Sequence, residues 1–289
     1  MIMPSNFYNQ YRSEFKSLIA SALKEDIQSG DHTSKSCIAP NSQSTAVLWA
    51  KEKGIIAGLE LAEKIFNYYD PKLQFNPLIN EGVEINEGMR VFTIQGNTQS
   101  LLATERLVLN TLQRMSGIAT YTNQLNKAIN HTSCKLLDTR KTTPNFRYPE
   151  KWAVYIGGGT NHRMGLFDAL MIKDNHIDFC GGVTQALERT QAYLKQLGKA
   201  LEVVVECRNP QEIQETLSFE FVSRILLDNH NLKELKEALK LIDGKKPTEA
   251  SGNITENNLV AVAETGVDFI SMGALTYAAK SIDLSLKAG

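Results

Sequence analysis

The second half of the chain has a regular rhythm, and this rhythm constrains the fold more than any other feature. Short apolar segments with the length of buried strands alternate with segments whose apolar residues recur at helical spacing. Successive strand–helix units predict parallel strands joined by right-handed crossovers. The predicted strands are residues 135–137, 169–172, 201–206, 225–228, 248–251 and 269–271, and helices are predicted between several of them, such as 183–197, 232–242 and 256–265.

Six units of this kind predict an α/β barrel with fewer strands than the usual eight. A doubly wound open sheet is the alternative. Both folds place the carboxyl ends of their parallel strands at one edge of the sheet, where ligands bind. The loops that follow the predicted strands are therefore the first place to look for a functional site.

The first hundred residues follow a different pattern. Apolar residues from Phe7 to Leu23 predict an opening amphipathic helix, and a turn is predicted at residues 30–34. Residues 45–50 are predicted as a strand, and the glycine-punctuated alternation of residues 73–95 is typical of β hairpins. A helical stripe starts at Ser100, and Ser116 and Gly117 are predicted to break it. These patterns predict a small mixed α/β domain ahead of the barrel.

Composition excludes several classes of protein. A chain of 289 residues with 42% hydrophobic and 22% charged residues is ordinary for a soluble globular protein. A net charge of -1 argues against nucleic acid as a bulk partner, and no apolar run approaches the length of a membrane span. The N-terminus lacks the apolar core of a signal peptide. The four cysteines form no CxxC pair, which argues against a zinc cage or a disulfide framework, and a cytoplasmic location is expected.

The predicted strands of the second half end in charged or polar residues. A charge after one strand is usually a loop residue that meets water, but six consecutive cases of mixed sign favour a shared site. A glycine triplet at Gly157–Gly159 leads to a further polar segment. The residues concerned are Asp138, Arg140, Lys141, His162, Arg163, Lys173, Glu206, Asp228, Ser251 and Ser271.

The signs of these charges indicate the chemistry. Arg140, Lys141, His162, Arg163 and Lys173 are suited to hold an anion with several carboxylates or phosphates. Two carboxylates, Glu206 and Asp228, suit a Mg²⁺ ion, sugar hydroxyls or a developing positive charge. The glycines of the late loops, Gly252 and Gly273, fit a phosphate cradle of backbone N–H groups. A substrate with phosphates, a ribose and Mg²⁺ matches both sets.

Seven segments of the chain resemble the quinolinate phosphoribosyltransferase family (nicotinate-nucleotide pyrophosphorylase, decarboxylating). They are DTRKTTP, EKWAV, GGGTNHRMGL, IKDNH, LLDNH, TEASGNIT and FISMGALT, and they occur in the family's order. The resemblance as a whole runs from about Asp31 to the C-terminus. The resemblance implies an N-terminal α/β sandwich domain at residues 1–115, joined by the tail 277–289, and an incomplete TIM-like α/β barrel at residues 116–276. It also implies a reaction in which quinolinate and phosphoribosyl pyrophosphate give nicotinate mononucleotide, pyrophosphate and CO2.

The resemblance assigns roles residue by residue. It implies catalytic roles for Lys141, Glu206 and Asp228, with the two carboxylates beside the ribose and Mg²⁺. It implies an arginine that enters the neighbouring subunit's site, Arg106, and hence an obligate homodimer. The other implied substrate contacts are Thr139, Arg140, His162, Arg163, Lys173, Ser251, Gly252, Asn253, Ser271, Gly273 and Ala274.

Three alternatives stay open at this point. A nicotinate phosphoribosyltransferase would need fewer cations around its substrate ring, and a metabolite sensor on the same fold would not need Glu206 and Asp228. Glu202 competes with Glu206 for the place in the site. The chain also departs from many family members at Asn145, Phe146, Tyr155 and Tyr277.

Overall fold

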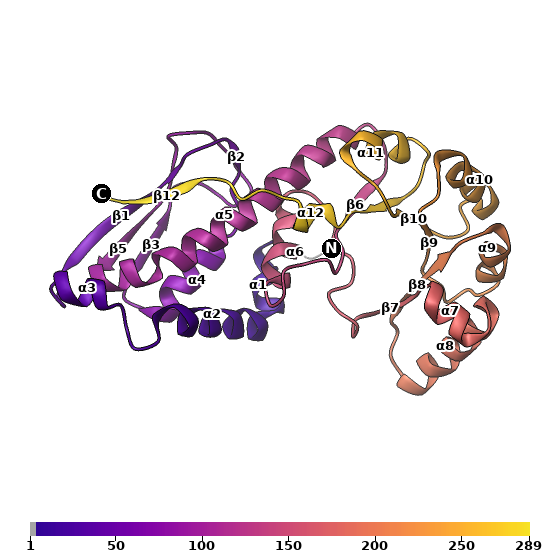
Figure 1. Cartoon of the computed structure of the whole chain (residues 1–289), viewed down its shortest axis with the longest axis horizontal. Helices are drawn as coiled ribbons and strands as arrows, with labels where there is room; N and C mark the ends of the chain where they lie inside the picture. The colour runs from indigo at the N-terminus through magenta and orange to yellow at the C-terminus, as the bar shows by residue number, and fades with distance from the viewer. Residues whose placement is uncertain (1–3) are drawn as a thin grey trace. The chain divides into compact units, whose positions relative to one another are not determined.

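The computed structural model describes residues 4–289, which divide into two compact units (Figure 1). The N-terminal unit comprises the described residues up to 124 together with residues 142–158 and 275–289. The barrel unit comprises residues 125–141 and 159–274. The chain passes between the two units several times, so neither unit is one continuous stretch of sequence.

The barrel unit is built on a six-stranded parallel sheet with the strand order β6-β11-β10-β9-β8-β7. The first strand along the chain pairs with the last, while β7 to β11 follow one another in sequence. This cyclic order is that of a barrel, because a doubly wound sheet reverses its order at a switch point. The strands are β6 (Lys135–Leu137), β7 (Ala169–Ile172), β8 (Glu202–Cys207), β9 (Arg224–Asp228), β10 (Thr248–Ser251) and β11 (Phe269–Ser271).

β6 and β7 are the two edges of this sheet, so the barrel is incomplete and the predicted fold class is confirmed. Figure 1 shows the helices of the unit on the outer side of the curved sheet. They are α7 (Asp174–Cys180), α8 (Val183–Leu197), α9 (Pro210–Leu217), α10 (Leu232–Ile242) and α11 (Glu256–Ala263).

Local sequence explains where these helices begin. Asn209 caps α9 by accepting a hydrogen bond from Glu212 N at 3.0 Å, and Pro210 occupies the first helical position. Asn231 and Glu234 form a capping box at the start of α10. Each cap satisfies backbone donors that a helix terminus would otherwise leave unpaired. The chain therefore turns from strand to helix immediately after the strand ends that carry the charged residues.

The N-terminal unit contains an antiparallel sheet with the order β12-β1-β5-β3. Figure 1 shows α2 (Arg12–Ile27), α4 (Leu59–Tyr69) and much of α5 (Thr98–Ile129) on one side of this sheet. The tail contributes β12, which pairs with β1. The strands are β1 (Gln43–Ala50), β3 (Gln74–Pro77), β5 (Arg90–Asn97) and β12 (Leu284–Ala288), and β2 (Gly54–Ile55) pairs separately with β4 (Glu84–Ile85).

An aromatic cluster attaches the first helices to α6 (Arg147–Ile156). Phe7 of α1 (Pro4–Gln10) stacks on Trp152 with ring centroids 5.5 Å apart, and Phe15 of α2 meets the same ring edge-on. Tyr11 lies 5.0 Å from the ring of Tyr148. Aromatic pairs of this kind add to the hydrophobic burial of the rings. The N-terminal unit includes α6 as part of residues 142–158, and it also includes residues 116–124. The sequence had placed both ranges in the barrel domain.

The predicted break at Ser116 and Gly117 is wrong, because α5 is one helix of 32 residues. Ser116 Oγ accepts a hydrogen bond from Ala57 N at 2.9 Å and donates one to Ala57 O at 3.3 Å. A Cβ added to Gly117 would lie 2.0 Å from the carbonyl oxygen of Lys280. The small residues permit close packing against two neighbouring segments and do not end the helix.

Two further local predictions are wrong. Residues 30–34 are not simply a turn, because Asp31 caps a short helix, α3 (His32–Cys37), by accepting a hydrogen bond from Ser34 N at 3.0 Å. The residues 73–95 do not form hairpins of successive strands, because β3 pairs with β5 and β4 pairs with β2. A short helix after the last barrel strand, α12 (Ala274–Tyr277), leads into the tail.

We predict that Gly117→Ala destabilises the protein by about 1–3 kcal/mol, the range for overpacking a close contact. Alanine favours a helix over glycine by about 1 kcal/mol, but the clash with a backbone oxygen outweighs this gain. Urea unfolding followed by circular dichroism measures the difference. Asn110→Ala, at an exposed position of the same helix, is the control and should be neutral or slightly stabilising. Equal or greater stability of Gly117→Ala would show that the close approach is not as described.

Candidate active site

One face of the barrel sheet carries the predicted polar residues. Residues two apart on a strand share a face, and Leu226 pairs with both Glu206 and Glu249. Asp228, two residues after Leu226, therefore lies on the same face, as does its partner Ser251. Ser271 follows Phe269, the partner of Glu249, by two residues. The opposite face packs under the helices and is apolar, with Val203, Val205, Ile225, Leu227, Ala250 and Ile270 all buried.

Glu206 and Asp228 lie close enough to influence each other. Burial raises the pKa of Glu206, the negative charge of Asp228 raises it further, and Lys173 opposes the change. Glu206 is only 8% exposed and lies next to the last residue of β8. Glu202 begins the same strand, at its amino end, and is exposed. Of the two glutamates, Glu206 is thus the one that lies at the carboxyl end with Asp228.

Asp138 anchors the segment that follows the glycine triplet. Its side chain is fully buried and accepts hydrogen bonds from Asn161 Nδ2 at 2.6 Å and from His162 N at 2.8 Å. The backbone of Thr160 forms a parallel bridge with Leu137 of β6. Asp138 is therefore a structural anchor that fixes the turn carrying His162 and Arg163 beside the end of β6.

The His162 side chain is almost completely buried. Its ring Nδ1 accepts a hydrogen bond from Arg163 N at 2.7 Å, so the neutral ring carries its proton on Nε2. Nε2 lies 3.3 Å from Glu249 Oε2, and the His162 side chain is 7% exposed. Both ring nitrogens face protein groups, so a direct contact between this ring and a substrate stays a prediction.

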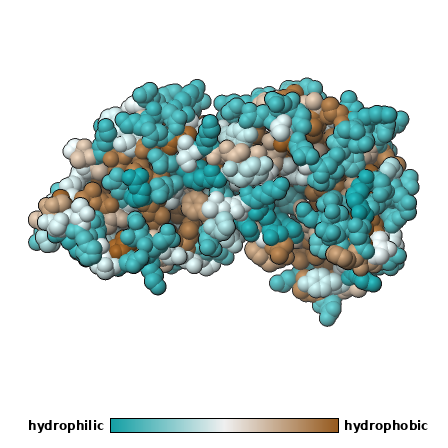
Figure 2. Space-filling view, in the orientation of Figure 1, coloured by the Kyte–Doolittle hydropathy of each residue, from teal (hydrophilic) through white to brown (hydrophobic). Residues whose placement is uncertain are grey.

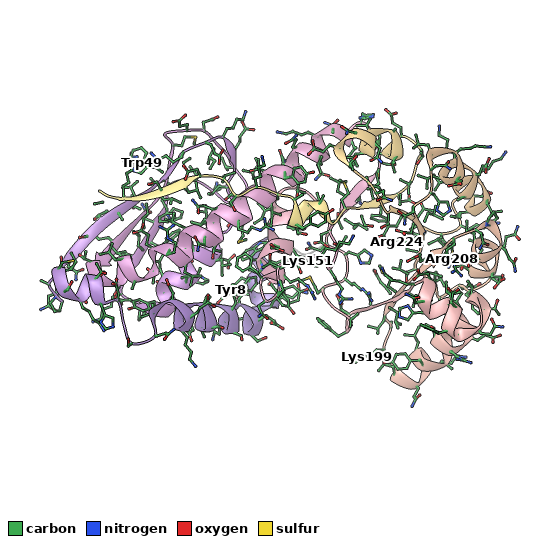
Figure 3. All side chains as sticks on the ribbon, in the orientation of Figure 1. Tyr8, Trp49, Lys151, Lys199, Arg208 and Arg224 are labelled. Atoms are coloured by element: carbon green, nitrogen blue, oxygen red, sulfur yellow. The ribbon has the colours of Figure 1, made fainter. Side chains whose placement is uncertain are left out.

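Glu249 was not predicted to matter individually, yet it joins the Arg224 guanidinium and the His162 ring inside the barrel. Arg224 Nη1 donates to Glu249 Oε2 at 2.8 Å, and the guanidinium lies 4.3 Å from the ring centre of Phe269 (Figure 3). Burial alone would raise the pKa of Glu249, but His162 and Arg224 outweigh it and the pKa is lowered. In the sequence, Glu249 is a charged residue inside a short strand, whereas the predicted site residues were those that follow the strands.

Arg140 and Arg163 form the cationic side of the site. Burial lowers the pKa of Arg163 and the nearby positive charge of Arg140 lowers it further. Arg163 Nη1 also donates to the backbone oxygen of Ala169 at 3.1 Å, at the start of β7. Lys173 follows the last residue of β7 and caps α7. Two guanidinium groups held near each other are suited to bind an anion between them.

The loops after β9 and β10 fit together closely. Gly252 has a φ of +85°, and a Cβ there would lie 2.2 Å from Asn229 Oδ1. The same oxygen accepts a hydrogen bond from Asn253 Nδ2 at 2.9 Å. A buried hydroxyl, Ser271 Oγ, finds no hydrogen-bond partner among the described residues. These features fit the predicted phosphate loops, although Gly273 and Ala274 gain no specific support from the described contacts.

A buried ion pair in the N-terminal unit was also missed. Glu150 is fully buried and accepts hydrogen bonds from Arg114 Nη2 at 2.8 Å and from Thr143 N at 2.9 Å. Arg114 additionally donates to the backbone oxygens of Thr276 and Ala279 at 2.6 and 2.8 Å. The pair joins α5, the segment after Lys141, helix α12 and the residues that follow it. In the sequence, Glu150 belongs to the EKWAV segment of the family resemblance.

The remaining predicted residues lie in different places. Thr139 and Lys141 follow β6, where Thr139 Oγ1 accepts a hydrogen bond from Lys141 N at 3.0 Å. Arg106 is exposed on α5 and belongs to the N-terminal unit. Figure 2 shows hydrophilic residues over most of the visible face, with smaller hydrophobic areas between them. Within residues 4–289, every helix falls short of the length or apolar character that crossing a bilayer requires.

The donor set limits how a metal could bind. Among residues 4–289, no group of three or more His, Cys, Asp or Glu side chains is arranged to hold a metal ion. Mg²⁺ is commonly held by one or two carboxylates together with substrate phosphates and water. Glu206 and Asp228, two neighbouring carboxylates on one face, fit an ion that arrives with a phosphorylated substrate.

The chain matches two family profiles along most of its length. They are described as the N-terminal domain of quinolinate phosphoribosyl transferase, over residues 31–116, and its C-terminal domain, over residues 118–287. A mitochondrial quinolinate phosphoribosyltransferase (decarboxylating) 2b of Nicotiana tabacum is 44% identical in an alignment that covers 95% of this chain and 82% of that protein. The chloroplastic nicotinate-nucleotide pyrophosphorylase (carboxylating) of Arabidopsis thaliana is 42% identical, with the same coverage of 95% and 82%.

Solved structures agree with these matches. The nicotinate-nucleotide pyrophosphorylase of Francisella tularensis is 40% identical and superposes with a TM-score of 0.87 over 96% of both chains. Similarity of this extent covers both units and the order of all the site segments. The fold and the resemblance inferred from the sequence are therefore confirmed.

We predict that Asp228→Asn lowers the pKa of Glu206, because it removes a negative charge that raises that pKa. A titration of the Glu206 carboxyl by NMR, with Glu206→Gln used to assign its signal, measures the change. The direction of the change in stability with pH follows from the difference between the folded and unfolded pKa values of Glu206. A carboxyl with a raised pKa in the folded state contributes stability at pH values below its unfolded pKa, and loses it as pH rises through the folded pKa.

Glu206→Gln should therefore gain stability relative to the unmodified protein as the pH rises above the ordinary pKa of a glutamate carboxyl. Glu202→Gln, at the exposed opposite end of the strand, is the matched control. An unchanged Glu206 pKa in Asp228→Asn would show that the two carboxylates do not face each other.

Proposed function

We propose, because this chain belongs to the quinolinate phosphoribosyltransferase family, that it transfers a phosphoribosyl group from phosphoribosyl pyrophosphate to quinolinate with loss of CO2. The products are nicotinate mononucleotide and pyrophosphate. The observation that carries the proposal is the match of both family domains across residues 31–116 and 118–287. The site on one face of the barrel supports it, because cations and carboxylates gather there at the strand ends.

The cations would bind and orient the substrates. Arg140, Arg163 and Lys173 would hold the two carboxylates of quinolinate, so that its ring nitrogen points at C1 of the ribose. Fixing two reactants in a reactive geometry removes much of the entropic barrier to their reaction. The glycine-containing loops at residues 251–253 and 271–274 would bind phosphate through backbone N–H groups. Thr139 and His162 complete the proposed contacts.

The carboxylates would act on the sugar. As the bond between C1 and pyrophosphate breaks, positive charge develops on the ribose, and the bond from the ring nitrogen to C1 forms. Glu206 and Asp228 would stabilise that charge at short range in a site with little water. Lys141, near the reacting groups, would stabilise the negative charge that leaves with pyrophosphate. A Mg²⁺ ion bound with the substrate would neutralise further phosphate charge beside Glu206 and Asp228.

Decarboxylation would follow on the product of the first step. With the ring nitrogen bonded to C1, the ring is a pyridinium that accepts the electron pair left when the 2-carboxylate departs as CO2. A proton then replaces the carboxylate at C2. The ring itself provides the electron sink, so Mg²⁺ is the only cofactor that we propose.

We predict that turnover requires quinolinate, phosphoribosyl pyrophosphate and Mg²⁺ together. The reason is the combination of a cationic set for a dicarboxylate with two carboxylates for the ribose and metal. Release of labelled CO2 from quinolinate, with nicotinate mononucleotide detected in parallel, measures the reaction. Nicotinate is the control substrate and Ca²⁺ the control ion. Equal efficiency with nicotinate would contradict the assignment in favour of the reaction without decarboxylation.

We further propose a homodimer in which Arg106 completes the site of the neighbouring subunit. Its exposed position on α5, with no hydrogen bond or ion pair described among residues 4–289, leaves the guanidinium available to a partner. An isologous interface would exchange the same element in both directions. The cytoplasmic location expected from the sequence also stays a prediction, since two relatives are named as mitochondrial and chloroplastic.

Complementation tests this arrangement. Arg106→Ala and Lys141→Ala should each be nearly inactive alone, because each lacks one residue in every site. Mixed and allowed to exchange subunits, they should form heterodimers with one intact site of two. Random exchange makes half of the dimers mixed, so about a quarter of all sites should recover activity.

Asn110→Ala, another exposed position on α5, is the control and should be active by itself. Subunit exchange is verified separately with differently tagged chains. Verified exchange without any recovery of activity would place Arg106 in its own subunit's site or outside every site.

A further inference from the structure

The geometry points to Arg208 as a positioning residue that holds helix α7, and with it Lys173, at a fixed place relative to Glu206. This inference rests on the proposed function, since Lys173 and Glu206 belong to the proposed site. Arg208 follows β8 directly and lies two residues beyond Glu206. Figure 3 shows it beside the end of that strand, near the helices that cover it.

The guanidinium of Arg208 binds two carboxylates from two helices. Its Nη1 and Nη2 atoms donate to both oxygens of Asp178, at 3.0 and 2.8 Å, in a two-pronged arrangement. Its Nε and Nη2 atoms donate to Glu212 Oε1 at 3.0 and 2.7 Å. The backbone N–H of Arg208 donates to the other oxygen of Glu212 at 2.7 Å. Asp178 lies on α7 and Glu212 on α9, so one side chain ties both helices to the end of β8.

Planar geometry makes this arrangement directional. An arginine that binds a carboxylate through two parallel hydrogen bonds fixes the orientation of its partner as well as its distance. Lysine has one charged nitrogen and cannot make the same pair of bonds. Asp178 and Glu212 together hold the pKa of Arg208 above its ordinary value, so the guanidinium stays charged.

Helix α7 begins at Asp174, immediately after Lys173, which caps it. A shift of α7 would therefore move Lys173. The groups that face Glu206 are Asp228 on β9, Lys173 and Asp174 at the start of α7, and Arg208 on its own strand end. Lys173 stabilises the charged form of Glu206, while Asp228 and Asp174 destabilise it. The position of α7 thus sets where Lys173 lies relative to Glu206 and Asp228.

A purely structural role is the competing explanation. The Arg208 side chain is 40% exposed and Asp178 is 56% exposed, and an exposed ion pair contributes little to stability. The Glu212 side chain is only 11% exposed, however, and the guanidinium fork restrains orientation even where it adds little free energy. We therefore expect the effect in the kinetics of the enzyme and only a small one in its thermal stability.

Two substitutions separate position from charge. Arg208→Lys keeps the positive charge but cannot make the paired hydrogen bonds to Asp178. Asp178→Asn leaves Arg208 charged and weakens the contact between Arg208 and α7. Each should raise KM for quinolinate by roughly three- to tenfold, because Lys173 belongs to the proposed contacts with quinolinate. KM for phosphoribosyl pyrophosphate should change little, a selectivity that a general loss of structure would not produce. The double variant should be little worse than either single variant, since both break the same contact.

Lys233→Gln is the matched control, because it removes an exposed ion pair on α10, 3.9 Å from Glu237, and should leave the kinetics unchanged. Melting temperatures are measured for every variant. Wild-type kinetics in Asp178→Asn, an equal rise in KM for both substrates, or fully additive effects would overturn the positioning role. If the unmodified enzyme itself failed to use quinolinate, the proposed function would fail instead, and the two failures are thereby distinguished.

Discussion

The pairing of β6 with β11 is the constraint on which the candidate site depends. Met272 N, just past β11, donates to the carbonyl oxygen of Leu137 at 3.0 Å, so the loop after the first barrel strand starts beside the loop after the last. Residues 139–141 and 271–274 are separated by most of the barrel in sequence. Without this pairing β6 would not lie beside β11, and these two loops would not start next to each other. The parallel register then brings Glu206, Asp228 and Ser251 to the same end.

In the N-terminal unit, the ion pair of Arg114 with Glu150 also brings together segments that are far apart in the sequence. One buried carboxylate accepts bonds from α5 and from the backbone at Thr143, and the arginine extends the network to Thr276 and Ala279. Loss of the arginine would leave the Glu150 carboxylate, whose side chain is fully buried, without its cationic partner, at a cost of roughly 3–5 kcal/mol. The segments that leave the two site loops after Lys141 and after Ala274 are thus held by the same pair of side chains.

The sequence predicted the barrel well because its strands are short, apolar and followed by helices with strong caps. Period and punctuation are local signals, and local signals were enough for the six barrel strands and for helices α8, α10 and α11. The failures involve contacts between distant segments. Gly117 was taken for a helix break, whereas its missing side chain makes room for the backbone at Lys280. The pairing of β3 with β5 depends on packing that a hairpin pattern does not record.

The same distinction between local signals and distant contacts applies to the residues of the candidate site. Residues at strand ends, such as Asp228 and Lys173, were predicted from the punctuation of the chain. Glu249 was not singled out, since a charge inside a strand has meaning only when its partners Arg224 and His162 are known. Asp138 was grouped with the charged residues of the site, but its hydrogen bonds show an anchor for the turn at residues 161–163. A role that depends on partners far apart in the sequence requires the folded structure.

Like charges are gathered at this site in a way that folding alone does not favour. Arg163 lies near Arg140, and Glu206 near Asp228, and in each case the neighbour makes the charged form less favourable. A fold selected only for stability would intersperse these signs, because a nearby opposite charge stabilises an ion and a like charge destabilises it. The arrangement is favourable when each group meets its complement: the arginines an anion, the carboxylates a cation or a sugar that becomes positively charged. Segregated charge of both signs on one face of a barrel is therefore the physical signature of a site for a substrate that carries both.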